Sequence, residues 1–157
     1  MMILPYDRIS AVEYAKNWAM KRNPLYYNFD GQGGDCTNFI SQCIYAGSRV
    51  MNYTKDTGWY YNSPSDRAAA WSAAQYLYNF LISNKGAGPY AVSTSNPDPG
   101  DIILLNNGDE FYHSLIISGF ENGVPLVCAH TDDSLMRPLD TYYFSGKEIL
   151  HIDAIRK

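Results

Sequence analysis

Apolar and polar positions repeat with a helical period in the first half of the chain and with a strand-like period in the second half. Residues 6–21 follow Pro5 and carry apolar residues spaced three or four apart, which is typical of one helix face. These apolar positions are Ile9, Val12, Ala15, Trp18 and Ala19. The pattern predicts a first helix over this segment.

A glycine-rich loop precedes the second predicted helix. The segment NPLYYNFDGQGGD ends with three glycines among its last five residues, which favours a tight backbone bend. Asp35 suits the N-cap position and Gly47 suits the end of a helix. We therefore expect a helix that begins near Cys36 and turns one apolar stripe inward. That stripe consists of Phe39, Ile40, Cys43 and Ile44.

A polar, aromatic loop through Trp59, Tyr60 and Tyr61 comes before a third predicted helix. The segment SPSDRAAAWSAAQYLYNFLISN has the apolar spacing of one continuous helix. Gly86 and Gly88 follow it and should end it. Its apolar side is formed by Ala70, Trp71, Ala74, Leu77, Tyr78 and Leu81.

The rest of the chain predicts strands. After the turn NPDPGD, four strands are expected in DIILLN, YHSLIIS, PLVCAHTD and ILHIDAI, because each is short and rich in β-branched and other apolar residues. Asn122-Gly123 between the second and third strands favours a type I′ hairpin turn. Helices followed by an antiparallel sheet predict the α+β class. At 157 residues, we expect one domain over residues 1–157.

Composition and charge narrow the classes of function. The hydrophobic fraction of 46% and the charged fraction of 18% are ordinary for a globular domain. A net charge of −4 without any run of Lys or Arg argues against nucleic acid as a partner. No apolar stretch is long enough for a transmembrane segment. The start MMILPYDR lacks the pattern of a signal peptide, so the protein is expected to be intracellular unless a leader has been removed; localisation and protein partners stay open.

The cysteines point to a single reactive thiol. Three cysteines are too few for a disulfide framework, and without a Cys-x-x-Cys pair they predict no metal site. Cys36 stands at a polar helix start, where free N–H groups favour a thiolate and can hold an oxyanion. Cys43 lies inside the apolar stripe and reads as a structural cysteine. Cys36 is therefore the candidate nucleophile.

A thiol nucleophile needs a base, and the chain has three histidines. His113 stands where a polar loop meets a strand, and His130 ends the next strand. With Asn122 and Gly123 as the central turn residues, His113 should face Asp132, and Leu115 should face His130 on the same face of the hairpin. His113, His130 and Asp132 would then converge. His151 lies among apolar residues and is interpreted as structural or surface-exposed.

The segments YDRISAVEYAKNW, NPLYYNFDGQGGDCTNFISQCIYAG, PGDIILL, YHSLIIS and AHTDD occur in this order from Tyr6 to Asp133. They resemble the putative amidase domain family, which is similar to the NlpC-like and CHAP cell-wall hydrolases of the papain-like fold. The resemblance implies that Cys36 is the nucleophile and His113 its base. It also implies a third polar residue at His130, while charge favours Asp132 as the partner of an imidazolium. The family usually has two glycines where this chain has Gly47-Ser48.

The resulting expectation is a cysteine amidase or peptidase that works through a thioester acyl-enzyme and needs no cofactor. The resemblance implies peptide or peptidoglycan stem peptide as substrate. Two alternatives stay open: a catalytically silent binding module of the same fold, and an acyltransferase that uses the same residues with an amine acceptor. A metal site built from Cys36, His113 and His130 is the remaining alternative, which no paired-ligand spacing supports.

Two further expectations concern the details of the site. Trp59, Tyr60, Tyr61 and Trp71 are candidates for an aromatic cleft wall, although Trp71 also fits the helix core, and Gln32 is a candidate donor to the oxyanion. The helix start and an imidazolium at His113 should together lower the pKa of Cys36, giving a thiolate–imidazolium pair before substrate arrives.

Overall fold

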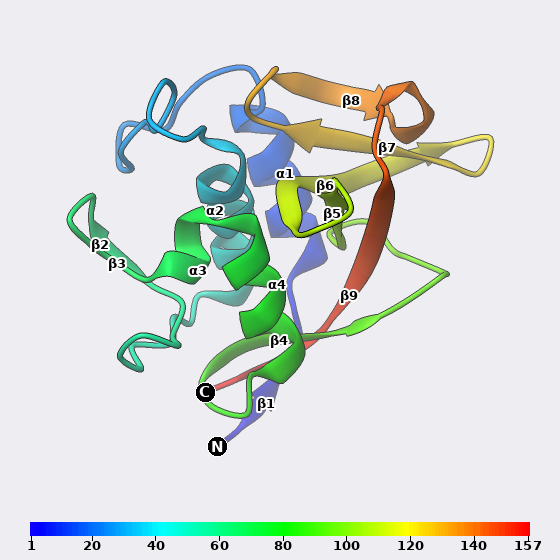
Figure 1. The fold of residues 1–157 in the computed structure, drawn as a ribbon. Helices are drawn as coiled ribbons and strands as arrows, with labels where there is room; N and C mark the ends of the chain where they lie inside the picture. Colours follow the sequence, from blue (N-terminus) through cyan, green and yellow to red (C-terminus); the bar gives the residue numbers. More distant parts are fainter.

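The computed structural model describes residues 1–157 and consists of helices packed against one face of a curled, antiparallel seven-stranded sheet (Figure 1). The helices are α1 (Arg8–Trp18), α2 (Cys36–Ser48), α3 (Ala69–Ser72) and α4 (Ala74–Ser83), with a 3-10 helix, η1 (Leu139–Thr141), late in the chain. The strands of the sheet are β1 (Ile3–Leu4), β4 (Gly88–Ser93), β5 (Ile102–Asn106), β6 (Phe111–Glu121), β7 (Val124–Ala129), β8 (Ser134–Pro138) and β9 (Gly146–Arg156). The α+β prediction is confirmed.

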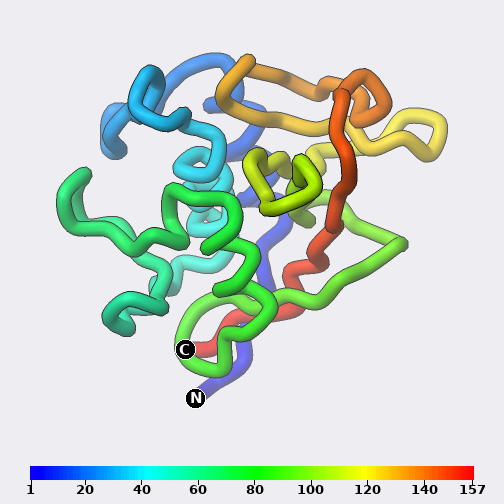
Figure 2. The backbone as a smooth tube through the Cα atoms, viewed as in Figure 1, coloured from blue at the N-terminus to red at the C-terminus, as the bar shows by residue number.

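The sheet order is β1-β9-β5-β6-β7-β8, and β4 pairs with the last part of β9, on the edge opposite β1. All four predicted strands form, as β5, β6, β7 and β9. The short strands β1, β4 and β8 were not predicted. β4 begins at Gly88, which the sequence pattern suggested only as a helix stop. The two ends of the chain meet at this side of the molecule (Figure 2), where Met2 N donates to the Lys157 carbonyl over 2.8 Å.

The helix beginning at Cys36 forms as predicted, but its end differs. α2 runs through Gly47 to Ser48 and stops at Arg49, which adopts the left-handed conformation with φ 59°. A left-handed residue after the last helical turn is the usual way to end a helix, and glycine is the residue that adopts it most easily. Here arginine occupies that position.

The predicted third helix is not continuous. Its first part forms a small hairpin, β2 (Tyr61–Ser63) with β3 (Asp66–Arg67), and the rest is split into α3 and α4. The break falls at Ala73, whose φ of −128° and ψ of 125° are extended. This break accompanies burial of Trp71, whose ring packs 4.9 Å from that of Trp59 and whose Nε1 donates to Asn38 of α2 over 2.9 Å. Tertiary packing has overridden helix propensity here.

The β6–β7 hairpin has the predicted turn. Asn122 and Gly123 both have positive φ, at 50° and 80°, as a type I′ turn requires. Next to the turn the register is the expected one, with Phe120 opposite Pro125. The register shifts by one residue between Ile117 and Gly119, so that Ile117 pairs with Val127. This bulge reverses which residues share a face.

The bulge overturns the predicted convergence of three polar residues. Ile116 pairs with Cys128 on the helix-facing side of the sheet, and His130, two residues beyond Cys128, faces the same side and stacks on Phe39. His113 instead pairs with Leu105, which packs in a smaller core on the opposite face. The predicted pairing of His113 with Asp132 and of Leu115 with His130 is therefore wrong.

Two apolar clusters hold these layers together. The larger lies between the helices and the sheet and includes the indole rings of Trp59 and Trp71. The smaller lies on the other face of β5, β6 and β7 and is closed by Leu139 of η1. None of the helices has both the length and the apolar character needed to cross a bilayer.

Candidate active site

Cys36 is the first residue of α2 and follows the predicted tight bend. Gly31, Gly33 and Gly34 all have positive φ, between 79° and 96°, which only glycine adopts at little cost. A Cβ at Gly34 would also lie 3.1 Å from Thr131 Oγ1. The glycines therefore allow the loop to pass close to the β7–β8 turn and deliver Cys36 to the helix start.

Asp35 occupies the N-cap position, but its carboxylate makes no capping hydrogen bond. It accepts instead from Phe29 N and from Asn38 Nδ2, each over 2.9 Å, and contacts His130 Nδ1 at 2.6 Å. The first-turn N–H groups of α2 are consequently not capped by the Asp35 carboxylate. Such free N–H groups are the donors that stabilise an oxyanion.

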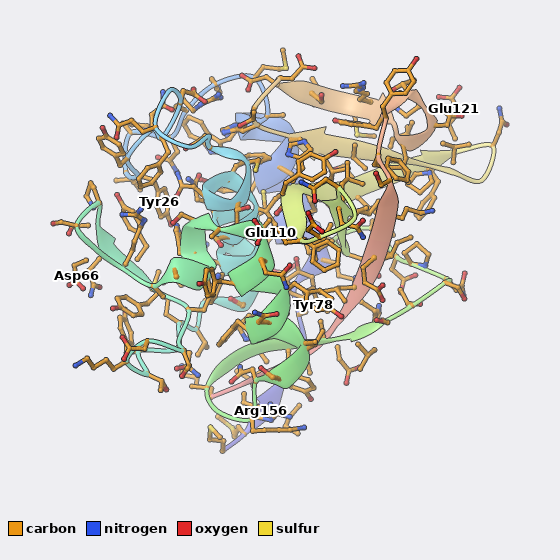
Figure 3. All side chains as sticks on the ribbon, viewed as in Figure 1. Tyr26, Asp66, Tyr78, Glu110, Glu121 and Arg156 are labelled. Atoms are coloured by element: carbon orange, nitrogen blue, oxygen red, sulfur yellow. The ribbon has the colours of Figure 1, made fainter.

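Cys36 lines a pocket of about 230 Å³. Small residues form much of its wall, including Gly33, Gly34, Ala73 and Ala74, while Tyr76 and Tyr112 add aromatic edges. Glu110, from the β5–β6 connection, is the charged side chain of the wall (Figure 3). The thiol is thus accessible from a narrow cavity between the helices and the start of β6.

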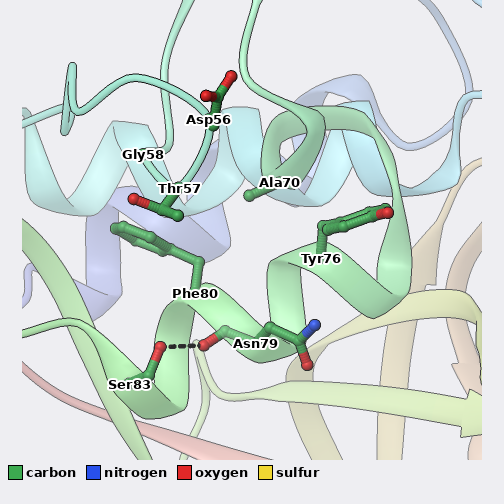
Figure 4. A pocket seen from close by; sticks show the side chains of 8 residues that line it. All are labelled: Asp56, Thr57, Gly58, Ala70, Tyr76, Asn79, Phe80 and Ser83. Carbon is green, nitrogen blue, oxygen red and sulfur yellow. Dashed lines mark hydrogen bonds between the residues drawn. The ribbon is translucent and has the colours of Figure 1, made fainter.

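A second pocket of about 260 Å³ lies along α4 (Figure 4). It is lined by polar groups of Asp56, Thr57 and Asn79 and by the ring of Phe80. Tyr76 borders both this pocket and the Cys36 pocket.

The Cys36 thiol is surrounded by weak polar partners. Its Sγ lies 3.7 Å from Thr37 Oγ1. Burial raises the pKa of the Cys36 thiol, and this effect outweighs the lowering contributed by the Thr37 hydroxyl and by backbone N–H groups of Ser114 and Thr37. The resting form at neutral pH is therefore the protonated thiol.

His113 stands next to this site, one residue before Ser114. Its ring lies toward Tyr142, with 6.2 Å between ring centroids, and neither ring nitrogen makes a hydrogen bond. Burial lowers the pKa of His113 to about 4; the charge of Arg137 lowers it further and that of Asp132 raises it. The imidazole is therefore neutral at pH 7. A thiolate–imidazolium pair requires a lowered pKa at Cys36 and a raised pKa at His113, and both shifts have the opposite sign. The predicted ion pair is therefore wrong for the protein without substrate.

His130 does not orient His113. Its Nδ1 lies 2.6 Å from Asp35 Oδ2 and its Nε2 lies 2.8 Å from the Trp18 carbonyl. Both ring nitrogens of His130 are thus engaged by a buried carboxylate and a backbone carbonyl, and neither is directed at His113. Burial acts to raise the pKa of Asp35, but the hydrogen bonds from His130, Phe29 and Asn38 hold it below its usual range.

Asp132 is exposed, and its carboxylate lies 3.5 Å from Arg137 Nη1. It makes no hydrogen bond to His113, although its charge acts on that ring. Cys36, His113 and His130 thus have separate sets of neighbours and do not converge as metal ligands. The candidate cluster of Asp98, Asp101 and His151 lies elsewhere, where the β4–β5 connection meets His151 of β9.

In that cluster the Arg8 guanidinium supplies the positive charge. It lies 2.7 Å from Asp101 Oδ1 and 3.2 Å from His151 Nδ1, as expected for a structural histidine.

The predicted cleft residues lie away from the thiol. Trp59 and Trp71 are fully buried in the main core, so they cannot wall a cleft; their Nε1 groups donate to Ser41 and Asn38. Gln32 is exposed and its side chain does not line the Cys36 pocket. The sequence did not indicate Thr37 and Ser114 as contacts of the thiol. Their positions in the sequence could have indicated them, because Thr37 directly follows the candidate nucleophile and Ser114 directly follows the candidate base.

Comparison with known proteins gives two matches. The family model described as "Putative amidase domain" matches residues 5–152. The chain is 40% identical over 140 residues to "Uncharacterized protein YhbB" of Bacillus subtilis (strain 168), an alignment that covers 84% of this chain and 43% of that relative. This chain therefore spans less than half the length of that protein. No solved structure matches the chain.

Proposed function

This chain belongs to the putative amidase domain family, and we propose that it hydrolyses an amide bond with Cys36 as its nucleophile. The observation that carries the proposal is the position of the thiol. Cys36 lines a pocket at the start of a helix whose first-turn N–H groups have no capping side chain. A carbonyl bound in this pocket would have the nucleophile and oxyanion donors on the same side.

His113 is the proposed base because it is the histidine that is free to accept a proton. His130 already uses both nitrogens, and His151 bonds to Asp101 over 3.0 Å. The neutral form that burial imposes on His113 is the form a base requires. No hydrogen bond joins the two residues here, and the His113 ring lies toward Tyr142. The proposed proton transfer therefore requires the start of β6, with the ring, to move toward the thiol.

The proposed reaction begins with transfer of the Cys36 thiol proton to His113. The thiolate attacks the carbonyl carbon, and the oxyanion receives hydrogen bonds from the start of α2. The protonated His113 then gives its proton to the leaving amine, which departs and leaves a thioester on Cys36. Water, losing a proton to His113, attacks the thioester; the carboxylic acid leaves and the thiol takes back its proton. Asp132 supplies the negative charge that favours the imidazolium.

Peptides, including peptidoglycan stem peptides, are the proposed substrates. The support is family membership and the narrow wall of small residues around Cys36, which suits an extended backbone. Acyl transfer to an amine would use the same thioester. The separation of Cys36 from His113 in this state favours one alternative, a peptide-binding module without turnover.

The test is to incubate the protein with purified peptidoglycan and with model peptides and to identify the products by mass spectrometry. We expect hydrolysed amide bonds with wild type and no turnover with Cys36→Ala. Cys43→Ala is the matched control: Cys43 is fully buried in the core, so this variant should keep its activity while losing about 1–2 kcal/mol of stability. Equal loss of activity in both folded variants would contradict the assignment, and amine-linked products would identify a transferase.

A further inference from the structure

A chain of two buried hydroxyl groups connects the Cys36 thiol with the strand that carries His113. Cys36 Sγ lies 3.7 Å from Thr37 Oγ1, and Thr37 Oγ1 lies 2.9 Å from Ser114 Oγ. Thr37 is 1% exposed and Ser114 is fully buried. The chain crosses from the first turn of α2 to β6, one residue beyond His113.

The orientation of these hydroxyls is not the usual one for a helix. A Ser or Thr within a helix commonly bonds to the carbonyl four residues earlier, as Ser83 does with Asn79 over 2.5 Å in α4 (Figure 4). Thr37 is in the first turn and directs its Oγ1 to the thiol and to β6 instead. Ser114 Oγ makes no other hydrogen bond than the one to Thr37. The hydrogen-bonded series that starts at the Ser114 hydroxyl therefore ends at the Cys36 thiol.

Two hydroxyls in series suit a group that alternates between two charge states. Each hydroxyl can donate one hydrogen bond and also accept. With the thiol protonated, S–H donates to Thr37 and Thr37 donates to Ser114. With a thiolate, Ser114 donates to Thr37 and Thr37 donates to the sulfur. The direction of both hydrogen bonds reverses when the two hydroxyl groups rotate about their C–O bonds, and no heavy atom has to move.

We infer that Thr37 and Ser114 are positioning residues that hold the Cys36 sulfur at the start of α2 and stabilise it as a thiolate when its proton leaves. The inference rests on the proposed function, because it concerns the same nucleophile. The two hydroxyls have different roles: the Thr37 hydroxyl contacts the sulfur directly, and the Ser114 hydroxyl acts through that of Thr37. The same contact ties the nucleophile helix to the strand that carries the proposed base.

The test measures alkylation of Cys36 by iodoacetamide as a function of pH, with the modified residue identified by mass spectrometry. Thr37→Val keeps the side-chain shape and removes the hydroxyl. We expect its pH midpoint to rise by about one unit and its rate at pH 7 to fall about tenfold, since a hydrogen bond to a charged group is lost. Thr37→Ser, which keeps the hydroxyl, should restore the wild-type profile.

Ser114→Ala should shift the midpoint in the same direction by less, and the double variant Thr37→Val/Ser114→Ala should shift it no further than Thr37→Val alone. Ser118→Ala is the matched control, because Ser118 is a buried serine of the same strand that bonds to the Ile116 carbonyl instead. Its profile should equal that of wild type.

An unchanged midpoint in folded Thr37→Val would overturn the inference, and so would an equal shift in Ser118→Ala. If Thr37→Val fails to fold, a wild-type midpoint in Ser114→Ala overturns it in the same way. These readouts do not require turnover. Absence of amide hydrolysis by wild type therefore counts against the proposed function alone, and an unmoved alkylation profile counts against the hydroxyl chain alone.

Discussion

Burial controls the protonation of the two residues proposed to react. It raises the pKa of the Cys36 thiol and lowers that of His113 to about 4, since in both cases the charged form loses solvation. At neutral pH the resting forms are a protonated thiol at Cys36 and a neutral imidazole at His113. A nucleophile in this state must lose its proton during the reaction, so the base has to approach when substrate is bound.

The low pKa of His113 has a measurable consequence for stability. In the unfolded chain a histidine takes up its proton near pH 6.5, whereas folded His113 does so near pH 4. Between these values the unfolded state binds more protons, so the free energy of unfolding should fall as pH is lowered from 6.5 to 4. In His113→Gln, which does not titrate, the fall in the free energy of unfolding over this pH range should be smaller by up to about 3 kcal/mol. Urea unfolding of both proteins at several pH values measures it; parallel curves would contradict the burial of His113.

His130 and Asp132 should respond differently to truncation. His130→Ala leaves the Asp35 carboxylate buried without its partner, which should cost about 3–5 kcal/mol. Asp132→Ala removes an exposed charge, so stability should stay within about 0.5 kcal/mol while turnover falls up to about fivefold. Urea unfolding and turnover of both variants decide the question. A His130→Ala variant as stable as wild type but inactive would restore the catalytic role that the family resemblance implies.

At the scale of elements, α2 has an unusual residue at each end. At its start, Asp35 is engaged with His130 and leaves the first-turn N–H groups uncapped. The β7–β8 turn holds this arrangement, because Thr131 Oγ1 accepts from Asp35 N over 3.1 Å. Thr131 has a φ of 60°, a strained conformation for a β-branched residue. The turn therefore fixes the loop that delivers Cys36.

At the other end of α2, Arg49 is left-handed. Replacing it with glycine removes the steric cost of that conformation, although glycine also gains freedom in the unfolded chain. We expect Arg49→Gly to raise the free energy of unfolding by about 0.5–1 kcal/mol. Arg49→Ala is the control, because it removes the guanidinium but keeps the cost, and it should give no gain. Thermal and urea unfolding of the three proteins measure the effect; equal gains in both variants would point to the charge of Arg49 instead.

At the scale of the whole molecule, the charge near the thiol has the same sign as the net charge of the chain. The net charge is −4, and the charged side chain in the wall of the Cys36 pocket is the carboxylate of Glu110. A carboxylate near the entrance favours approaching cations and disfavours anions, and salt weakens both effects.

Charge-selective thiol reagents measure this preference without a substrate. Cationic aminoethyl methanethiosulfonate should modify Cys36 faster than anionic sulfonatoethyl methanethiosulfonate at low salt. Glu110→Gln should reduce the ratio of the two rates by up to about fivefold. Asp109→Asn is the control, because Asp109 precedes Glu110 in the same connection but does not line the pocket. Equal changes in both variants would mean that the general surface charge acts on the thiol, and not the pocket wall.

The sequence by itself determined the features that depend on neighbouring residues. A glycine-rich bend and an apolar stripe predicted α2 and the position of Cys36 at its start, and Asn122-Gly123 predicted the type I′ turn. Strand-like apolar runs predicted β5, β6, β7 and β9. Each follows from backbone preferences and local periodicity, which act over a few residues.

Tertiary structure alone decided the features that depend on distant contacts. The bulge between Ile117 and Gly119 places His113 and His130 on opposite faces of the sheet. No local sequence pattern reveals it, because both registers are compatible with the same apolar runs in the two strands. The break at Ala73 arises where Trp71 is buried against α2. Asp35 and His130, far apart in the sequence, come into hydrogen-bond contact only in the fold. The pKa shifts of Cys36 and His113 also arise there, because desolvation depends on what the whole chain packs around a group.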